Sequence, residues 1–223
     1  MSRIEAARAL DPTRTITVVS GLPRSGTSML MQMLEAAGLE VATDGRRVAD
    51  SDNPNGYYEL DAVKRLREDS SFLKSVVGQV VKIVSPLIPF LPPEYDYRVI
   101  SMERDLNDVM ASQRVMLDRQ VNSDVRQPDD EALARAYRRQ LEKVNLWLAG
   151  QPNVRTCFVS HKQAVTSPGE TSVAVASFLD ETGAFRGMAN ESKCRELAAT
   201  RMAAVIDPHL YHEYQSFASK TPL

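Results

Sequence analysis

The sequence predicts an α/β fold in a single domain, and two observations indicate it. Four short β-branched or apolar segments alternate with longer segments of helical periodicity, which is the pattern of a mainly parallel β-sheet flanked by helices. The 223 residues are 43% hydrophobic and 25% charged, so the chain holds enough apolar material for one sizeable core. We therefore expect a three-layer domain over 1–223, with its core at about 15–206.

The amino-terminal half begins with a strand, a glycine-rich loop and a helix. The strand is expected over Thr15–Ser20 because it is β-branched and mostly apolar, and the helix over Thr27–Ala37 because Gly38 supplies a stop. A polar, turn-rich segment follows at 39–56. We then expect a polar helix over Tyr57–Leu73 and a second buried strand over Gln79–Val84.

The carboxyl-terminal half continues the alternation. Prolines between Ser85 and Pro93 exclude a long helix there. The remaining elements are expected, in chain order, as the strand Tyr97–Met102, a helix from Asp105, a polar linker at Ser123–Asp130, the amphipathic helix Glu131–Ala149, the strand Val154–Ser160, a helix capped by Ser167 and ending near Gly183, and the helix Glu191–Ile206.

Composition excludes several classes of protein. The formal net charge is −2 and the pI is about 6.0, with no basic stripe, so we expect no nucleic-acid partner. No apolar run approaches the ~20 residues that span a bilayer, and the first residues lack the apolar region of a signal peptide. Cys157 and Cys194 have no metal-ligand spacing. Together these features predict a cytoplasmic protein with two reduced thiols.

The loop between the first strand and the first helix nearly matches a Walker phosphate-binding loop, G-x-x-x-x-G-K-[ST]. Gly21 and Gly26 have the right spacing, Ser28 fits the hydroxyl position, and Thr27 stands where the lysine is expected. Because a glycine loop before a helix N-terminus binds anions, we expect a P-loop-like fold with an anion site here. The missing lysine, and the lack of a strand ending in a Walker B aspartate, disfavour a nucleoside triphosphatase.

A positive charge lies earlier in the same loop, and it carries a resemblance. The segment resembles the 5′-phosphosulfate loop, P-[KR]-S-G-T-[ST], of the sulfotransferases that use 3′-phosphoadenylyl sulfate (PAPS). The matching positions are Pro23, Arg24, Ser25, Gly26, Thr27 and Ser28. The resemblance implies transfer of a sulfuryl group from PAPS to an acceptor hydroxyl, or to an amine, with release of adenosine 3′,5′-bisphosphate (PAP).

Further segments extend the resemblance. In this family an arginine at a strand end and a serine on the next helix hold the 3′-phosphate. Arg104 and Ser112 have the same separation in sequence as that pair. Lys82 in "VVKIVSP" matches the lysine of a central strand, although Val84 replaces the histidine that serves as base in the cytosolic branch. His161 falls where the family has a tyrosine near the adenine. Arg186 in "FRGM" loosely matches a loop that also grips the 3′-phosphate.

The resemblance implies a metal-free mechanism. Arg24 would neutralise charge on the leaving 5′-phosphate, and Lys82 would contact the sulfuryl or bridging oxygen. Other branches of the family use a glutamate as general base, which points to Glu59 in "NPNGYYEL", with Asp52 and Asp44 as alternatives.

Two other interpretations remain open: a P-loop nucleotide kinase or hydrolase, and a non-catalytic nucleotide-binding protein. For an enzyme, the acceptor would be a small molecule or a glycan whose identity the sequence does not give. We expect the segments 39–56 and Ser85–Pro93 to shape its pocket, because such loops flank the ligand site of an α/β sheet. The oligomeric state is open as well.

Overall fold

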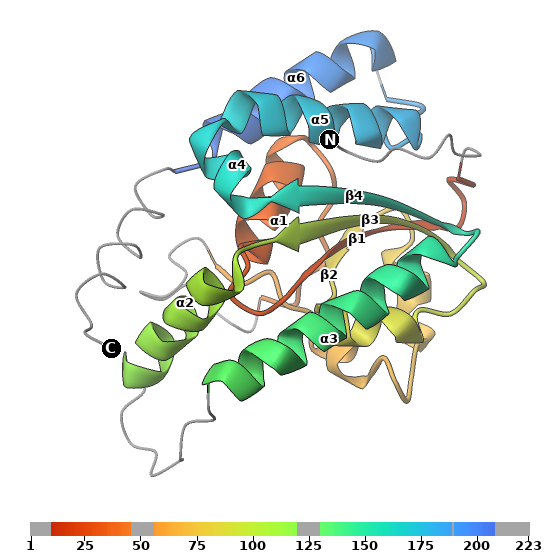
Figure 1. The fold of residues 1–223 in the computed structure, drawn as a ribbon. Coiled ribbons are helices and arrows are strands. Elements are labelled where there is room, and N and C mark those ends of the chain that lie inside the picture. Colours follow the sequence, from red (N-terminus) through yellow and green to blue (C-terminus); the bar gives the residue numbers. More distant parts are fainter. Residues whose placement is uncertain (1–9, 46–55, 120–129, 189, 208–223) are drawn as a thin grey trace.

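The computed structural model describes residues 10–45, 56–119, 130–188 and 190–207, and Figure 1 shows their arrangement. Four strands form one sheet in the order β2-β1-β3-β4, and every pairing is parallel. The strands are β1 (Thr15–Gly21), β2 (Val80–Lys82), β3 (Asp96–Glu103) and β4 (Val154–Ser160). The expectation of an α/β fold with a parallel sheet flanked by helices is confirmed.

One face of the sheet is covered by α1 (Thr27–Ala36), α5 (Pro168–Glu181) and α6 (Glu191–Ala204) (Figure 1). These helices bury their apolar sides against the strand residues that point to this face. The core on this side includes Val19, Leu30, Leu34, Ile100, Phe178 and Met202.

The opposite face is covered by α3 (Asp130–Ala149) and by three short 3₁₀ helices, η1 (Asp61–Arg65), η2 (Ser71–Val76) and η3 (Ser85–Phe90). Alternate residues of the same strands point here, which explains why the strands are apolar on both faces. The core on this side includes Ile16, Val18, Leu73, Val99, Val144 and Leu148. None of the described helices is long and apolar enough to cross a lipid bilayer.

Two helix ends form as the glycines predict. Gly38 closes α1 with φ 92°, and the Leu39 N–H donates to the Leu34 carbonyl at 3.1 Å. Gly183 closes α5 in the same way, with φ 77° and a 2.8 Å bond from the Ala184 N–H to the Leu179 carbonyl. In both cases a left-handed residue reverses the chain and satisfies terminal carbonyls.

The helix expected over Tyr57–Leu73 is wrong. The chain has no regular secondary structure from Gly56 to Leu60, and the short helices η1 and η2 follow. Tyr58 has φ 51°, which interrupts a right-handed helix near its start. The Asp69 carboxylate accepts from the Ser71 N–H at 2.9 Å and favours a turn between η1 and η2.

The segment after β4 also differs from the expectation. A short helix that the sequence did not predict, α4 (His161–Thr166), begins directly at the strand end. Its N-cap is Ser160, whose hydroxyl accepts from the Gln163 N–H at 3.3 Å. Ser167 does precede α5, but its hydroxyl makes no capping bond. The helix from Asp105 is present as α2 (Leu106–Arg119).

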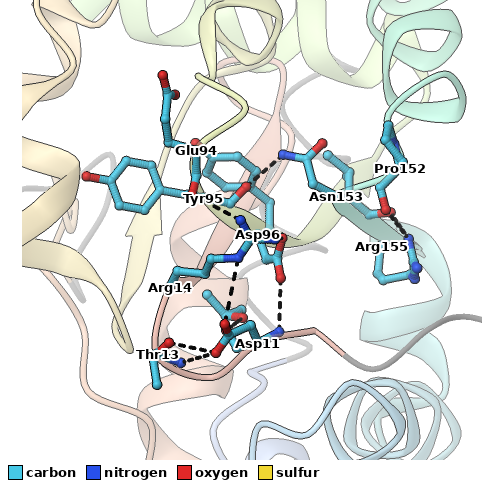
Figure 2. Close-up of polar contacts among 12 residues, drawn as sticks. Asp11, Thr13, Arg14, Glu94, Tyr95, Asp96, Pro152, Asn153 and Arg155 are labelled. Atoms are coloured by element: carbon cyan, nitrogen blue, oxygen red, sulfur yellow. Dashed lines mark hydrogen bonds and ion pairs between the residues drawn. The ribbon is translucent and has the colours of Figure 1, made fainter.

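The amino ends of the strands are fastened by a polar cluster (Figure 2). Asp96, at the start of β3, is 5% exposed. Its carboxylate accepts from the Arg14 guanidinium at 2.7 Å and from the Asp11 N–H at 2.9 Å. Nearby, the Asn153 amide donates to the Tyr95 carbonyl at 2.7 Å. These contacts tie the segment before β1 to β3, and the turn before β4 to the turn before β3.

The sheet order creates a switch point at the carboxyl ends of β1 and β3. From β1 the chain returns through α1 to β2 on one side, whereas from β3 it returns through α3 to β4 on the other. The two connecting helices lie on opposite faces. Chains that leave neighbouring strands in opposite directions open a crevice between them, where α/β proteins bind ligands.

Candidate functional site

The glycine loop lies at this switch point and is closely packed. A Cβ on Gly21 would stand 2.5 Å from the Ser25 hydroxyl and 2.9 Å from the Met102 carbonyl, so only glycine fits. The Ser25 N–H donates to the Leu22 carbonyl at 3.1 Å. Ser25 is 1% exposed, and its hydroxyl has no hydrogen-bond partner among the described residues. A buried hydroxyl in such a position is suited to donate a hydrogen bond to a polar ligand.

Arg24 is held at both its backbone and its side chain. Its φ is 67°, in the left-handed region that a non-glycine residue rarely adopts. The Arg104 guanidinium donates to the Arg24 carbonyl at 3.0 Å, and the Arg24 Nε donates to the Ser112 hydroxyl at 3.1 Å. Such backbone strain persists only where surrounding contacts fix it, and it is concentrated at functional sites.

Arg104 and Ser112 reach the loop from the adjacent strand. Arg104 directly follows β3, and Ser112 lies on α2, where it is 3% exposed. Figure 1 shows α2 beyond the arrowhead of β3, on the same side as the start of α1. The structure therefore brings together three residues that the sequence analysis selected from two separate motifs.

Helix α1 presents its positive end at the same place. Gly26, its N-cap, has φ 101° and carries no side chain to cap the helix. The first turn contains no acidic residue, so no carboxylate of its own neutralises the helix dipole there. Thr27 is buried and Ser28 is half-buried in this turn, while Pro23 in the loop is exposed. Such a terminus favours a bound anion.

His161 packs against the loop from the end of β4. It is 7% exposed, and burial, together with the nearby Arg104 charge, lowers its pKa to about 3. The imidazole is therefore neutral at physiological pH. Its Cδ2 lies 2.4 Å from the point that a Cβ on Gly26 would occupy. The sequence motif predicted that His161 lies near the nucleotide. It could not predict the contact with Gly26, because the two residues are far apart in the sequence.

Lys82 and Glu59 belong to a second group, at the end of β2. Lys82 is aligned with Val19 of β1, and its ammonium donates to the Tyr57 carbonyl. Glu59 is half-buried, and its backbone carbonyl accepts from the Thr43 hydroxyl at 3.1 Å and the Asp44 N–H at 3.2 Å. The segment that carries Glu59 thus lies against the segment 43–44 and the lysine.

The two alternatives to Glu59 fare differently. The Asp44 carboxylate accepts from the Asp61 N–H at 2.7 Å and so supports the start of η1. Asp52 lies outside the described residues. Two further polar residues, missed by sequence reasoning, lie near the strand ends: Ser20 on β1 and Ser85 after β2. Both are buried, and neither hydroxyl has a hydrogen-bond partner among the described residues. Their positions, at the end of one expected strand and directly after another, were the available signal.

Arg186 is not brought to the loop. Its guanidinium lies within about 3.2 Å of the point that a Cβ on Gly183 would occupy, at the end of α5. Its charge also helps to lower the pKa of Arg98, although burial is the larger cause. Arg98 precedes Arg104 by six residues of β3, a separation of roughly 20 Å along a strand. The role that the loose motif implied for Arg186 at the 3′-phosphate therefore lacks support from its position.

Comparison with known proteins adds no relative: neither a scan against models of protein families nor a search of curated proteins finds a match. Within the described part of the chain, no three His, Cys, Asp or Glu side chains come together as a metal site would need. The sequence motifs and the geometry around the loop are therefore the features that indicate a function.

Proposed function

We propose that this protein is a PAPS-dependent sulfotransferase with a P-loop-like fold. One observation carries the proposal. At the switch point of the sheet, Arg24 is hydrogen-bonded to both Arg104 and Ser112, which are 80 and 88 residues away in the sequence. Two guanidinium groups, a serine hydroxyl and a helix N-terminus without an acidic first turn, all at one point, suit a ligand with more than one anionic group.

The donor's two anionic ends would be held by different parts of this cluster. The loop amides, the α1 terminus and Arg24 would hold the 5′-phosphosulfate, where charge grows as the leaving group departs. Arg104 and Ser112 would hold the 3′-phosphate. The Ser112 oxygen accepts from Arg24, so its own O–H is available to donate to a phosphate oxygen.

The second group would act on the acceptor. In the transfer, the acceptor oxygen attacks sulfur, the bond from sulfur to the 5′-phosphate oxygen breaks, and PAP leaves. Glu59 would take the acceptor proton, and Lys82 would exchange the Tyr57 carbonyl for a sulfuryl or bridging oxygen. These residues and Arg24 would supply the charges that transfer requires, with a small molecule or a glycan as acceptor.

Ligand-induced thermal stabilisation tests the proposal against a kinase or hydrolase. We expect PAP to raise the Tm more than AMP, ADP or ATP at equal concentration, with no dependence on Mg²⁺, because the stabilisation by a ligand grows with its affinity for the native state. A Mg²⁺-dependent preference for ATP would instead favour the nucleotide kinase or hydrolase.

A further inference from the structure

His161 is the most enclosed ionisable residue at the candidate site. It is the first residue of α4, which begins where β4 ends and is capped by Ser160. Its ring thus comes from the strand that lies two places from β1 in the sheet, and it still reaches the loop that follows β1. The ring packs against Gly26, and the charge of Arg104 is near enough to lower its pKa.

The contact with Gly26 is sterically exclusive. Gly26 has φ 101°, and a Cβ there would stand 2.4 Å from His161 Cδ2 and 3.2 Å from Nε2. Real Cβ atoms do not approach other atoms so closely, so the imidazole fills the space that a side chain at position 26 would need. The His161 ring can therefore pack here only because residue 26 is a glycine.

The charge of the ring matters as much as its shape. Burial and the Arg104 charge lower the pKa of His161 and keep the ring neutral near pH 7. A cation at this place would repel Arg104, whose guanidinium holds the Arg24 carbonyl. The site therefore contains a flat ring that fills the space beside Gly26 and adds no positive charge near Arg104.

From this packing we infer that His161 is a positioning residue for the anion-binding loop, acting on Gly26 and Arg104 rather than on the base of the nucleotide. The inference rests on the proposed function for the identity of the ligand. Because only 7% of the residue is exposed, the ring offers little surface for stacking on an adenine. Its contact with the N-cap of α1 instead sets the direction from which the helix terminus meets an anion.

Two measurements on four proteins test the inference. The proteins are the native chain, His161→Ala, His161→Phe and Val165→Ala. The Phe variant restores a neutral ring, and Val165→Ala removes a buried side chain from the same short helix. Hydrogen exchange of the amides at 25–28 reports on the free loop. Isothermal titration with PAP, and with the guanosine analogue of PAP, reports on binding.

We expect His161→Ala to speed exchange of the loop amides by about tenfold or more, because loss of packing lowers the free energy of local opening. Both nucleotides should bind more weakly by the same factor. That factor is about tenfold, because a misplaced loop would lose about one hydrogen bond to the anion that they share. His161→Phe should recover most of both properties. Val165→Ala should change the Tm without changing loop exchange.

The outcomes separate the two proposals. Unchanged loop exchange in His161→Ala would overturn the positioning role, whatever the nucleotide affinities. A loss for PAP that greatly exceeds the loss for the guanosine analogue would place the ring at the base and would also overturn it. Failure of the native protein to bind PAP would reject the proposed function, while loop exchange would still decide the role of His161.

Discussion

At the scale of single residues, the candidate site depends on residues held in unfavourable backbone or charge states. Arg24 has left-handed backbone angles, and His161 is buried without its charge. The sequence predicted Arg24, Arg104 and Ser112 because their motifs are local and have fixed offsets. It could not predict that Arg24 bonds to the other two, or that His161 packs on Gly26, since these contacts depend on the order of the strands.

The buried histidine gives a pH dependence of stability. Its pKa is about 3 in the folded state and near 6.5 when exposed, so the unfolded chain binds more protons between these values. The contribution of the buried, neutral ring to stability is therefore present above pH 6.5 and is lost as the pH falls from 6.5 toward 3. Between pH 6.5 and 5.5 His161 should cost at most about 1.4 kcal/mol. Urea unfolding of the native protein and His161→Phe at both pH values should show a smaller loss in the variant; equal losses would contradict this origin.

The proposed base is tested by Glu59→Gln, which keeps the shape of the side chain and removes its proton affinity. We expect PAP affinity close to native and a kcat at least ~10²-fold lower, because a positioned base contributes that much to proton transfer. Asp44→Asn tests the alternative base in the same way, although that carboxylate also supports η1. If Glu59→Gln keeps most of its activity, the proton goes to another group, such as Asp52 or the acceptor itself.

At the scale of elements, the strands and long helices were predictable because their signals are local. Buried strands are β-branched, and α1 and α5 end at glycines. The helix expected over Tyr57–Leu73 failed because its segment has few apolar positions, and contacts from other elements, such as that between the Tyr58 hydroxyl and Glu35, fix it in another form. Helix α4 was missed because six residues carry too little periodicity to detect.

The helix stop at Gly38 gives a prediction for stability. Gly38 has φ 92°, and no heavy atom lies within 4 Å of the point that a Cβ would occupy, so only backbone strain opposes alanine. Gly38→Ala should lower the free energy of unfolding by about 1–2 kcal/mol. Gly169→Ala, in the first turn of α5 with equally open space, should leave it unchanged or raise it by up to about 1 kcal/mol. Equal effects of the two changes in urea unfolding would contradict the account.

At the scale of the whole molecule, the two ends of the sheet have different tasks. The amino ends carry the Asp96 cluster of Figure 2, in which the Asp96 carboxylate accepts hydrogen bonds from Asp11 and Arg14. The carboxyl ends carry the strained loop, both arginines of the proposed site and buried hydroxyls such as that of Ser25 without a partner among the described residues. We therefore expect substitutions at one end to affect stability and at the other to affect binding.

Asp96→Ala tests this division at the amino end. It leaves the Asp11 N–H and the Arg14 guanidinium without their buried acceptor, so we expect a loss of about 1–3 kcal/mol in the free energy of unfolding. PAP affinity should stay native. Glu131→Ala, which removes an exposed ion pair on α3, should change stability by less than about 1 kcal/mol. A variant at Asp96 that is as stable as the native protein would refute the role of the cluster.

The central claim is that Arg104 and Ser112 serve a 3′-phosphate, and isothermal titration with PAP and AMP tests it most directly. Since a hydrogen bond to a charged group contributes roughly 1.5–3 kcal/mol, the native protein should prefer PAP by about ten- to hundredfold. Arg104→Ala should remove most of the preference, mainly by weakening PAP, because AMP keeps the 5′-phosphate that the loop would hold. Ser112→Ala should act more mildly, and Arg114→Ala, which removes an exposed cation from α2, should leave the preference intact. Equal affinity of the native protein for PAP and AMP would contradict the assignment and, with it, the proposal of a sulfotransferase.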